Sequence, residues 1–260
     1  MLETNTAAVN LDGYVLRRLV HEDLQAVHDV HRSVISTLPT ADLFRDVSLE
    51  FLEVLLGDGA ATFGIFQHDD LVAYSAVRFP KAGELKLASI VGVPNALAEM
   101  VAEFEGVAVL PAHRGRGFQA ALTEIRAKAA LLDGRPIAIA SVAPQNLHSL
   151  RNFLLYGMTG RALVEMYGGY RRIVVVRDHG ASASTSEREN LIVDAREVEN
   201  LKDKMSVGYE IVDVIGAQRV DAYVISRRSR ERAYSDGSRA SEMDGYLISL
   251  RPERPGTPAL

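Results

Sequence analysis

The chain has 260 residues, of which 47% are hydrophobic and 24% are charged, and it contains no cysteine. This composition is globular, and it excludes disulfides, a thiolate nucleophile and cysteine metal ligands. A net charge of -5 disfavours a nucleic-acid partner, because non-specific binding to nucleic acid depends on positive charge. No stretch approaches the roughly 20 apolar residues that cross a bilayer, and residues 1–10 lack the pattern of a signal peptide. We therefore expect a cytoplasmic protein, without a membrane partner, that acts on small molecules or peptides.

Alternating strands and helices are predicted over the first two-thirds of the chain. A helix is expected from residue 21, where acidic residues favour a helix start, and another around residues 51–55. Apolar residues recur at steps of three and four over 118–132, which predicts an amphipathic helix, and Asn146 begins a further one. The expected strands are residues 14–19, 62–66, 71–77, 104–110, 137–142 and 173–176. Strands separated by helices of this length predict a mixed α/β fold.

The composition changes after residue 179. Residues 180–190 are rich in serine and small residues, which predicts a linker or exposed loop between a domain over 11–179 and an α/β extension over 191–250. In the extension we expect a helix over 198–205 and strands at 191–193, 210–215, 220–226 and 246–250. No catalytic motif is present there. The extension could cover the active site, mediate a homodimer or supply a strand to the main sheet.

A glycine-rich segment, Arg114-Gly115-Arg116-Gly117-Phe118-Gln119, lies between an expected strand and an expected helix. The N–H groups of a first helical turn and the positive end of the helix dipole form an anion site. Glycines let a phosphate approach the backbone closely, and the two arginines add positive charge. The segment lacks the Gly-Lys-Ser/Thr ending of a Walker loop and the third glycine of a dinucleotide fingerprint. It therefore predicts a phosphate or pyrophosphate site of another kind.

The segment resembles the acetyl-CoA signature of the GCN5-related N-acetyltransferase (GNAT) family, Gln/Arg-x-x-Gly-x-Gly/Ala. Here the pattern is Arg114-x-x-Gly117-x-Gln119, preceded by the Val-x-Pro-x-x-Arg-Gly context that is typical of the family. Gln119 replaces the usual small residue. Its side chain would either crowd a bound pyrophosphate or point away from it.

A second similarity to the family follows the apolar strand at 137–142. Asn146, Ser149 and Gly157-Met158 stand at the family's spacing. The resemblance covers residues 14–176 and implies the GNAT fold, a mixed and mostly antiparallel sheet flanked by helices. It also implies acetyl-CoA as acyl donor and no metal.

The resemblance implies direct attack of a neutral amine on the thioester, without a covalent enzyme intermediate. Backbone groups of residues 114–119 would hold CoA. A backbone N–H around Val107 and Val109 would contact the donor and stabilise the oxyanion. Glu105, on the same strand, is the candidate base, directly or through a water, with Glu103 in reserve.

The acid that protonates the departing thiolate is less clear from the sequence. Many relatives carry a tyrosine on the helix after Asn146, but Phe153 occupies that position here. Tyr156 follows three residues later and is the candidate acid, although packing alone would also explain it. We expect Asn146 to cap its helix, and Asn146, Ser149 and Phe153 to approach the cofactor.

The acceptor is expected to contact residues 34–44, 74–79 and 167–170, which carry little concentrated charge. We expect a primary amine of a small molecule, amino acid or peptide. Two alternatives stay open: a non-catalytic CoA-binding or scaffolding module, and an acyltransferase that uses a longer acyl-CoA. His28 and His31 lie three residues apart, but no third ligand completes a metal site, so we expect them at the surface or facing substrate.

Overall fold

The computed structural model describes residues 9–11, 13–84, 86–181, 190–217 and 220–227. The strands are β1 (Val9–Leu11), β2 (Tyr14–Arg18), β3 (Ala60–Gln67), β4 (Asp70–Arg78), β5 (Val101–Val109), β6 (Ile137–Val142), β7 (Thr159–Met166), β8 (Tyr170–Asp178), β9 (Asn190–Asp194), β10 (Tyr209–Ala217) and β11 (Val220–Arg227). The α-helices are α1 (Leu24–Ser36), α2 (Leu49–Leu55), α3 (Lys86–Ile90), α4 (Phe118–Leu132), α5 (Leu147–Leu155) and α6 (Val198–Ser206). Short 3-10 turns cover His21–Asp23, Asn95–Met100 and Pro111–His113.

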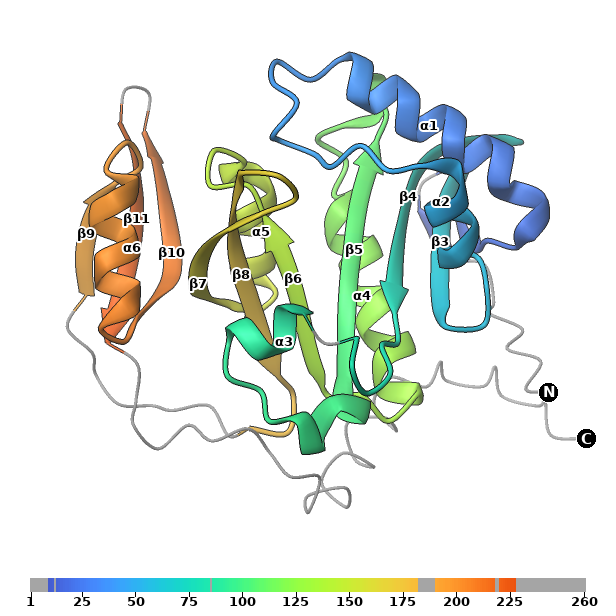
Figure 1. Ribbon diagram of the computed structural model, residues 1–260. Coiled ribbons are helices and arrows are strands. Elements are labelled where there is room, and N and C mark those ends of the chain that lie inside the picture. Colours follow the sequence, from blue (N-terminus) through green and yellow to red (C-terminus); the bar gives the residue numbers. More distant parts are fainter. Residues whose placement is uncertain (1–8, 12, 85, 182–189, 218–219, 228–260) are drawn as a thin grey trace, which may run out of the picture.

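The described strands form one sheet in the order β1-β2-β3-β4-β5-β6-β8-β7-β10-β11-β9. All of its neighbouring pairs are antiparallel except β5 and β6, which run parallel. Helices pack against this sheet (Figure 1). The predicted fold class, a mixed and mostly antiparallel sheet flanked by helices, is confirmed.

The predicted elements agree with the structure to within a few residues at their ends, with three omissions. The sequence analysis did not predict β1, α3 or β7. The first two have only three and five residues, too few to show a period. In β7, Gly160 and the mixed polarity of its neighbours obscure the strand pattern. The strand predicted at 246–250 lies outside the described residues, as do residues 182–189 of the predicted linker.

Two apolar clusters lie on opposite faces of the sheet. α1 and α2 cover one face, and α4 and α5 cover the other (Figure 1). On α1, Val27, Val30 and Val34 recur at helical spacing and pack with Leu52 and Leu55 of α2. Each side chain of this kind contributes about 1.5–3 kcal/mol when fully buried. This burial fixes α1, and with it the loop that follows, above the centre of the sheet.

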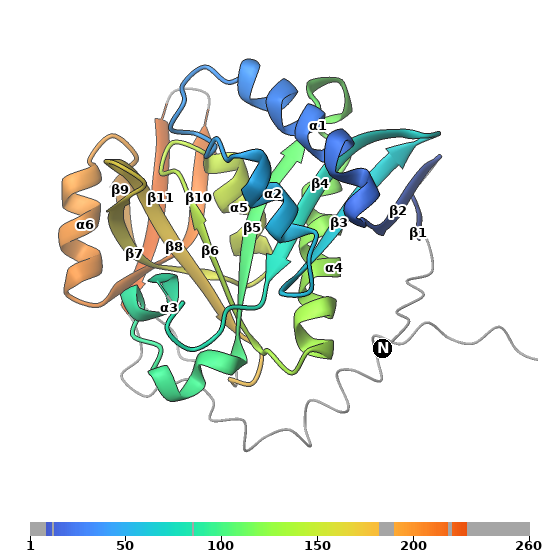
Figure 2. The same cartoon turned by 45° about the vertical axis from the view of Figure 1, so that its right-hand side comes forward.

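The centre of the sheet opens between β5 and β6. β6 pairs with β5 only from Val101 to Phe104, whereas β5 continues to Val109. The two strands are close at their N-terminal ends and diverge toward their C-terminal ends (Figure 2). The second half of β5 therefore has a sheet neighbour, β4, on one side only.

A bulge interrupts β5 where the two strands part. The register of β4 and β5 shifts between Ser75 and Val77, so that one residue of β4 faces both Glu105 and Gly106 of β5. The fully buried guanidinium of Arg126, from α4, donates a hydrogen bond from Nη1 to the Glu105 carbonyl at 2.8 Å. This bond satisfies a backbone group that the bulge removes from the regular ladder.

The C-terminal strands continue the main sheet. β10 pairs with β7 at Ile211 and Gly160, where a Cβ on the glycine would lie 2.9 Å from the Cβ of Ile211. A buried ion pair joins Arg161 to Glu210 across the same boundary at 3.0 Å. Of the three roles left open for the extension, supply of strands to the sheet is the one that the structure shows.

Tyr223 of β11 ties this region to the centre of the molecule. Its side chain is fully buried, and its hydroxyl donates to the carbonyl of Pro144, just before α5, at 2.8 Å. The division of the chain into a domain over 11–179 and an extension over 191–250 stays a prediction.

Candidate active site

The glycine-rich segment forms the predicted turn between β5 and α4. Gly115 and Gly117 both have φ of +77°, in the left-handed region that side chains disfavour. Gly117 is the N-cap of α4, and the helix begins at Phe118, which is buried. The side chains of Arg114 and Arg116 are exposed on either side of the first glycine. The turn therefore leaves the first N–H groups of α4 accessible to an anion.

Gln119 points away from this turn toward α5. Its amide nitrogen donates to Oγ of Ser149 at 2.9 Å, and its amide oxygen accepts from Nδ2 of Asn152 at 2.8 Å. The side chain therefore bridges α4 and α5. The expectation that the Gln119 side chain points away from a bound pyrophosphate is therefore the correct one.

The second half of β5 presents backbone donors to the gap. Alternate residues of a strand direct their N–H groups to opposite sides. Leu110 donates its N–H to the carbonyl of Val72 in β4 at 3.0 Å. By this alternation, Val107 and Val109 direct their N–H groups to the other side, where β6 has diverged. The carbonyl of Val109 accepts from Nε of Arg114 at 3.2 Å.

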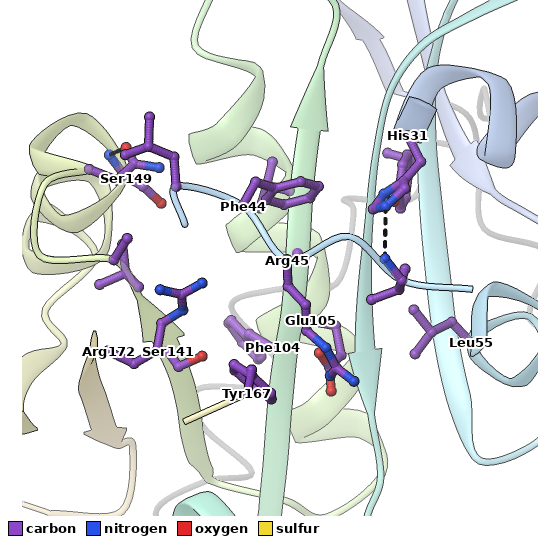
Figure 3. Close-up of a pocket in the computed structure, with 18 of the residues that line it drawn as sticks. His31, Phe44, Arg45, Leu55, Phe104, Glu105, Ser141, Ser149, Tyr167 and Arg172 are labelled. Atoms are coloured by element: carbon purple, nitrogen blue, oxygen red, sulfur yellow. Dashed lines mark hydrogen bonds between the residues drawn. The ribbon is translucent and has the colours of Figure 1, made fainter. Parts of the chain in front are cut away.

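A cavity of about 110 Å³ lies beside this gap, below the loop between α1 and α2 (Figure 3). Five of the predicted site residues line it: Glu105, Val107, Asn146, Ser149 and Phe153. The other residues that line it and bear on the argument are His31, Phe44, Arg45, Phe51, Leu52, Leu55, Tyr74, Phe104, Gly106, Ser141, Tyr167 and Arg172.

The two candidate bases on β5 differ in their surroundings. Glu105 is 22% exposed, lines the cavity and lies 3.4 Å from Nε of Arg78. Burial raises the pKa of Glu105, an effect that the charges of Arg78 and Arg45 oppose. Glu103 is 3% exposed and accepts a hydrogen bond from Arg78 at 2.5 Å. Burial raises the pKa of Glu103 as well, but only Glu105 lines the cavity, so we favour Glu105 over Glu103 as the general base.

The predicted residues on and after α5 fall into two places. Asn146 caps the helix, since its Oδ1 accepts from the Ser149 N–H at 3.1 Å, and this prediction is confirmed. Phe153 is buried against the cavity. Tyr156 is not among the residues that line the cavity, and its hydroxyl lies 3.3 Å from Nε2 of His179. The structure therefore does not bring Tyr156 together with Glu105.

His31 is buried. The sequence analysis expected it either at the surface or facing substrate. It lines the cavity, with Nδ1 2.8 Å from the Tyr74 hydroxyl and Nε2 accepting from the Val47 N–H at 3.2 Å (Figure 3). Nε2 also lies 3.4 Å from Oδ1 of Asp46. Burial lowers the pKa of His31, and this outweighs the attraction of Asp46. His28 is half-buried and lies outside the cavity lining.

Two arginines in the cavity wall correct the expectation that the acceptor side carries little charge. Arg45 lies in the loop between α1 and α2, just past the range considered, and Arg172 lies in β8. Figure 3 shows both guanidinium groups turned into the cavity. No local motif marks either residue. Only the approach of the loop to the β7–β8 hairpin places them together.

Among the described residues, no three histidine, aspartate or glutamate side chains gather closely enough to hold a metal ion. No helix in the described part of the chain combines the length and apolarity needed to span a bilayer.

Several solved structures are similar to this chain. A putative acetyltransferase, yncA from Salmonella typhimurium, solved with its cofactor acetyl-CoA, is 17% identical with a TM-score of 0.51, covering 67% of this chain and 99% of its own. The GNAT domain of S. lividans PAT is 20% identical with a TM-score of 0.50, covering 66% and 96%. FeeM, an N-acyl amino acid synthase from uncultured soil microbes, is 23% identical with a TM-score of 0.50, covering 64% and 91%. No family model and no curated protein matches the sequence.

Proposed function

We propose that this chain, which has the fold of the GCN5-related N-acetyltransferases, transfers an acetyl group from acetyl-CoA to a primary amine. One observation carries the proposal. The gap between β5 and β6 lies between an anion-binding turn at the start of α4 and a carboxylate with a raised pKa at Glu105. A phosphate-bearing thioester and an amine that must lose a proton need these two features side by side.

The donor site would use backbone groups more than side chains. The pyrophosphate of acetyl-CoA would bind the N–H groups of residues 115–119, with Arg114 and Arg116 adding positive charge. Val107 and Val109 would bind the acyl-carrying arm, which takes the place beside β5 that β6 has left. Asn146 and the other cavity-lining residues of α5 would form the opposite wall.

The reaction would proceed by direct attack. Glu105 accepts a proton from the ammonium group of the acceptor, and the neutral nitrogen attacks the thioester carbonyl carbon. A C–N bond forms, the carbonyl oxygen becomes an oxyanion, and an N–H group of β5 stabilises it. The oxyanion then collapses, the C–S bond breaks and the thiolate of CoA leaves. The nitrogen, which is positively charged in the intermediate, loses its second proton to the departing thiolate or to water, which gives the neutral amide. Tyr156 stays a prediction as the acid, since its hydroxyl adjoins His179 and a thiolate can depart without protonation.

The proposal is tested by calorimetric titration with acetyl-CoA, free CoA and octanoyl-CoA, followed by a thiol-release assay over a panel of amines. We expect acetyl-CoA to bind with a Kd on the order of 1–100 μM and release of CoA that depends on the amine. Arg114→Glu should weaken binding at least about tenfold, because it places a negative charge beside the phosphates. Arg196→Glu, a matched charge reversal at a side chain that is 82% exposed, should leave binding unchanged.

The alternatives give different results in the same experiment. Binding of CoA without turnover of any amine favours a non-catalytic CoA-binding or scaffolding module. Faster release from octanoyl-CoA than from acetyl-CoA favours a longer acyl donor. If no CoA binds, the transferase proposal is wrong.

A further inference from the structure

Two guanidinium groups, of Arg45 and Arg172, face the acceptor side of the cavity, and neither is in a close ion pair with a described residue. Arg172 is 4% exposed, and its Nη1 donates only to the neutral carbonyl of Arg171 at 2.8 Å. Among the described residues, no carboxylate lies within 4.0 Å of the side-chain nitrogens of Arg172 or Arg45. Burial lowers the pKa of Arg172 and Arg45 adds a smaller effect in the same direction, whereas Tyr167, Asp42 and Tyr170 oppose it. Two cations so placed are stabilised when an anion enters between them.

The ring of Tyr167 lies beside both arginines, and the Tyr170 ring also lies near Arg172, with its centroid 5.3 Å from the guanidinium carbon. The guanidinium carbon of Arg45 lies 4.4 Å from the centroid of the Tyr167 ring, and that of Arg172 lies 5.9 Å from it. Tyr167 has φ of +54°, which a bulky side chain rarely adopts and which costs of order 1–3 kcal/mol. Glycine would occupy this turn without strain, and the next two residues of the hairpin are glycines. The strained tyrosine is therefore explained by what its ring does rather than by the turn.

We propose that the acceptor carries a carboxylate as well as its amine, and that Arg45 and Arg172, aligned by Tyr167, bind this carboxylate. The inference deepens the proposed transferase function and rests on it. Guanidinium groups recognise carboxylates through paired, charge-assisted hydrogen bonds. The acceptor class is therefore the amino acids.

The position of Arg45 narrows the class further. Its guanidinium is turned toward the carboxylate of Glu105, and its charge opposes the rise in the pKa of Glu105 that burial causes (Figure 3). A carboxylate bound there lies close to the amine that Glu105 deprotonates, which fits an α-amino acid, since its two groups share one carbon. The remaining walls include Phe44, Phe51 and Leu55, which suit an apolar side chain. Leucine and phenylalanine are therefore suitable probes.

The test compares each amino acid with its decarboxylated amine: leucine with 3-methylbutylamine, and phenylalanine with 2-phenylethylamine. We expect the wild type to favour the amino acid in kcat/KM by at least about 100-fold, since each charge-assisted interaction contributes about tenfold or more. Arg172→Gln and Arg45→Gln should each lower this ratio about 10- to 100-fold. Arg171→Gln is the matched control, because Arg171 is exposed and pairs with Glu199 at 2.6 Å, and it should not change the ratio.

Tyr167→Gly provides a second test, which does not depend on whether the buried Arg172→Gln variant folds. It removes the strained backbone together with the ring, so the protein should stay folded by thermal denaturation while the ratio falls about tenfold. A wild-type ratio near one, or variants that lose both substrates equally, would overturn the proposal. If acetyl-CoA binds but no amine is turned over, the transferase proposal is wrong, and this result does not bear on the carboxylate site. Calorimetry with N-acetylleucine then decides the carboxylate site: binding that Arg172→Gln abolishes supports it, and absence of binding overturns it.

Discussion

At the scale of single residues, burial and partners give two carboxylates of one strand different roles. Glu103 and Glu105 both face Arg78, but Glu103 is tightly hydrogen-bonded and closed to solvent, whereas Glu105 lines the cavity. Glu103 is therefore a structural partner of Arg78. Glu105 keeps access to a ligand and can therefore accept a proton from it.

Glu105→Gln should lower kcat with the best amine about 10²- to 10⁴-fold, because the amide cannot accept the proton. In the wild type, kcat/KM should rise with pH through an apparent pKa above that of an ordinary glutamate, since burial raises the pKa of Glu105 and only the ionised form is a base. A pH–rate profile checks this, and the limb should be absent from the variant. Glu103→Gln should keep the limb and instead lower the Tm. If both variants keep full activity, Glu105 is not the base.

Gln119→Ala restores the small residue of the family signature and removes the bridge to Ser149 and Asn152. We expect a loss of about 1–2 kcal/mol in the free energy of unfolding, from two part-buried hydrogen bonds. The Kd for acetyl-CoA should change less than about threefold, since the side chain points away from the turn. Urea denaturation and calorimetry measure the two quantities. Much tighter binding of CoA would show that Gln119 obstructs the site.

At the scale of secondary-structure elements, the bulge in β5 shapes the cavity. The bulge contains Gly106, where a Cβ would lie 2.8 Å from the ring of Phe44. Phe44 belongs to the loop after α1 and lines the cavity. Gly106 is therefore required by the close approach of the Phe44 ring. Its backbone conformation is one that other residues also adopt.

Gly106→Ala should displace the Phe44 ring, raise KM for the amine and cost about 1–3 kcal/mol of stability through overpacking. Phe44→Leu combined with Gly106→Ala should recover part of both losses, because the smaller side chain makes room. A double-mutant cycle on stability and KM measures this coupling. Strictly additive effects would mean that the ring does not rest on this glycine.

At the scale of the whole molecule, buried polar contacts join the C-terminal strands to the main sheet, in addition to the pairing of β10 with β7. The ion pair of Arg161 and Glu210 and the bond from Tyr223 to Pro144 both cross the boundary. Pro144 lies two residues before the cap of α5, which lines the cavity. The C-terminal region therefore supports one wall of the candidate active site.

Tyr223→Phe should lower the free energy of unfolding by about 1–3 kcal/mol, because the buried carbonyl of Pro144 loses its donor. The Kd for acetyl-CoA should rise modestly, by about two- to fivefold, if the wall loosens. Tyr209→Phe is the matched control, since the half-buried Tyr209 ring packs near Lys204 and needs no hydroxyl for that contact. Thermal unfolding with and without acetyl-CoA checks both variants. An unchanged Tm for Tyr223→Phe would show that the bond contributes nothing to stability.

The sequence by itself determined what depends on neighbours along the chain. The extent of α4, the glycine turn before it and the cap at Asn146 were all predicted, because period, φ requirement and capping are local properties. The same holds for the strands on either side of the turn after Gln67. The acetyl-CoA signature is local as well, and so the candidate donor site could be predicted.

Only the tertiary structure decided which distant residues meet. The bulge that exposes Glu105, the contact of Gln119 with α5, and the meeting of Arg45 with Arg172 at Tyr167 each join separate elements. Such contacts leave no period or spacing in the sequence, since their partners can lie anywhere along the chain. The candidate acceptor site is built from these contacts, and for that reason its charge became apparent only in the folded protein.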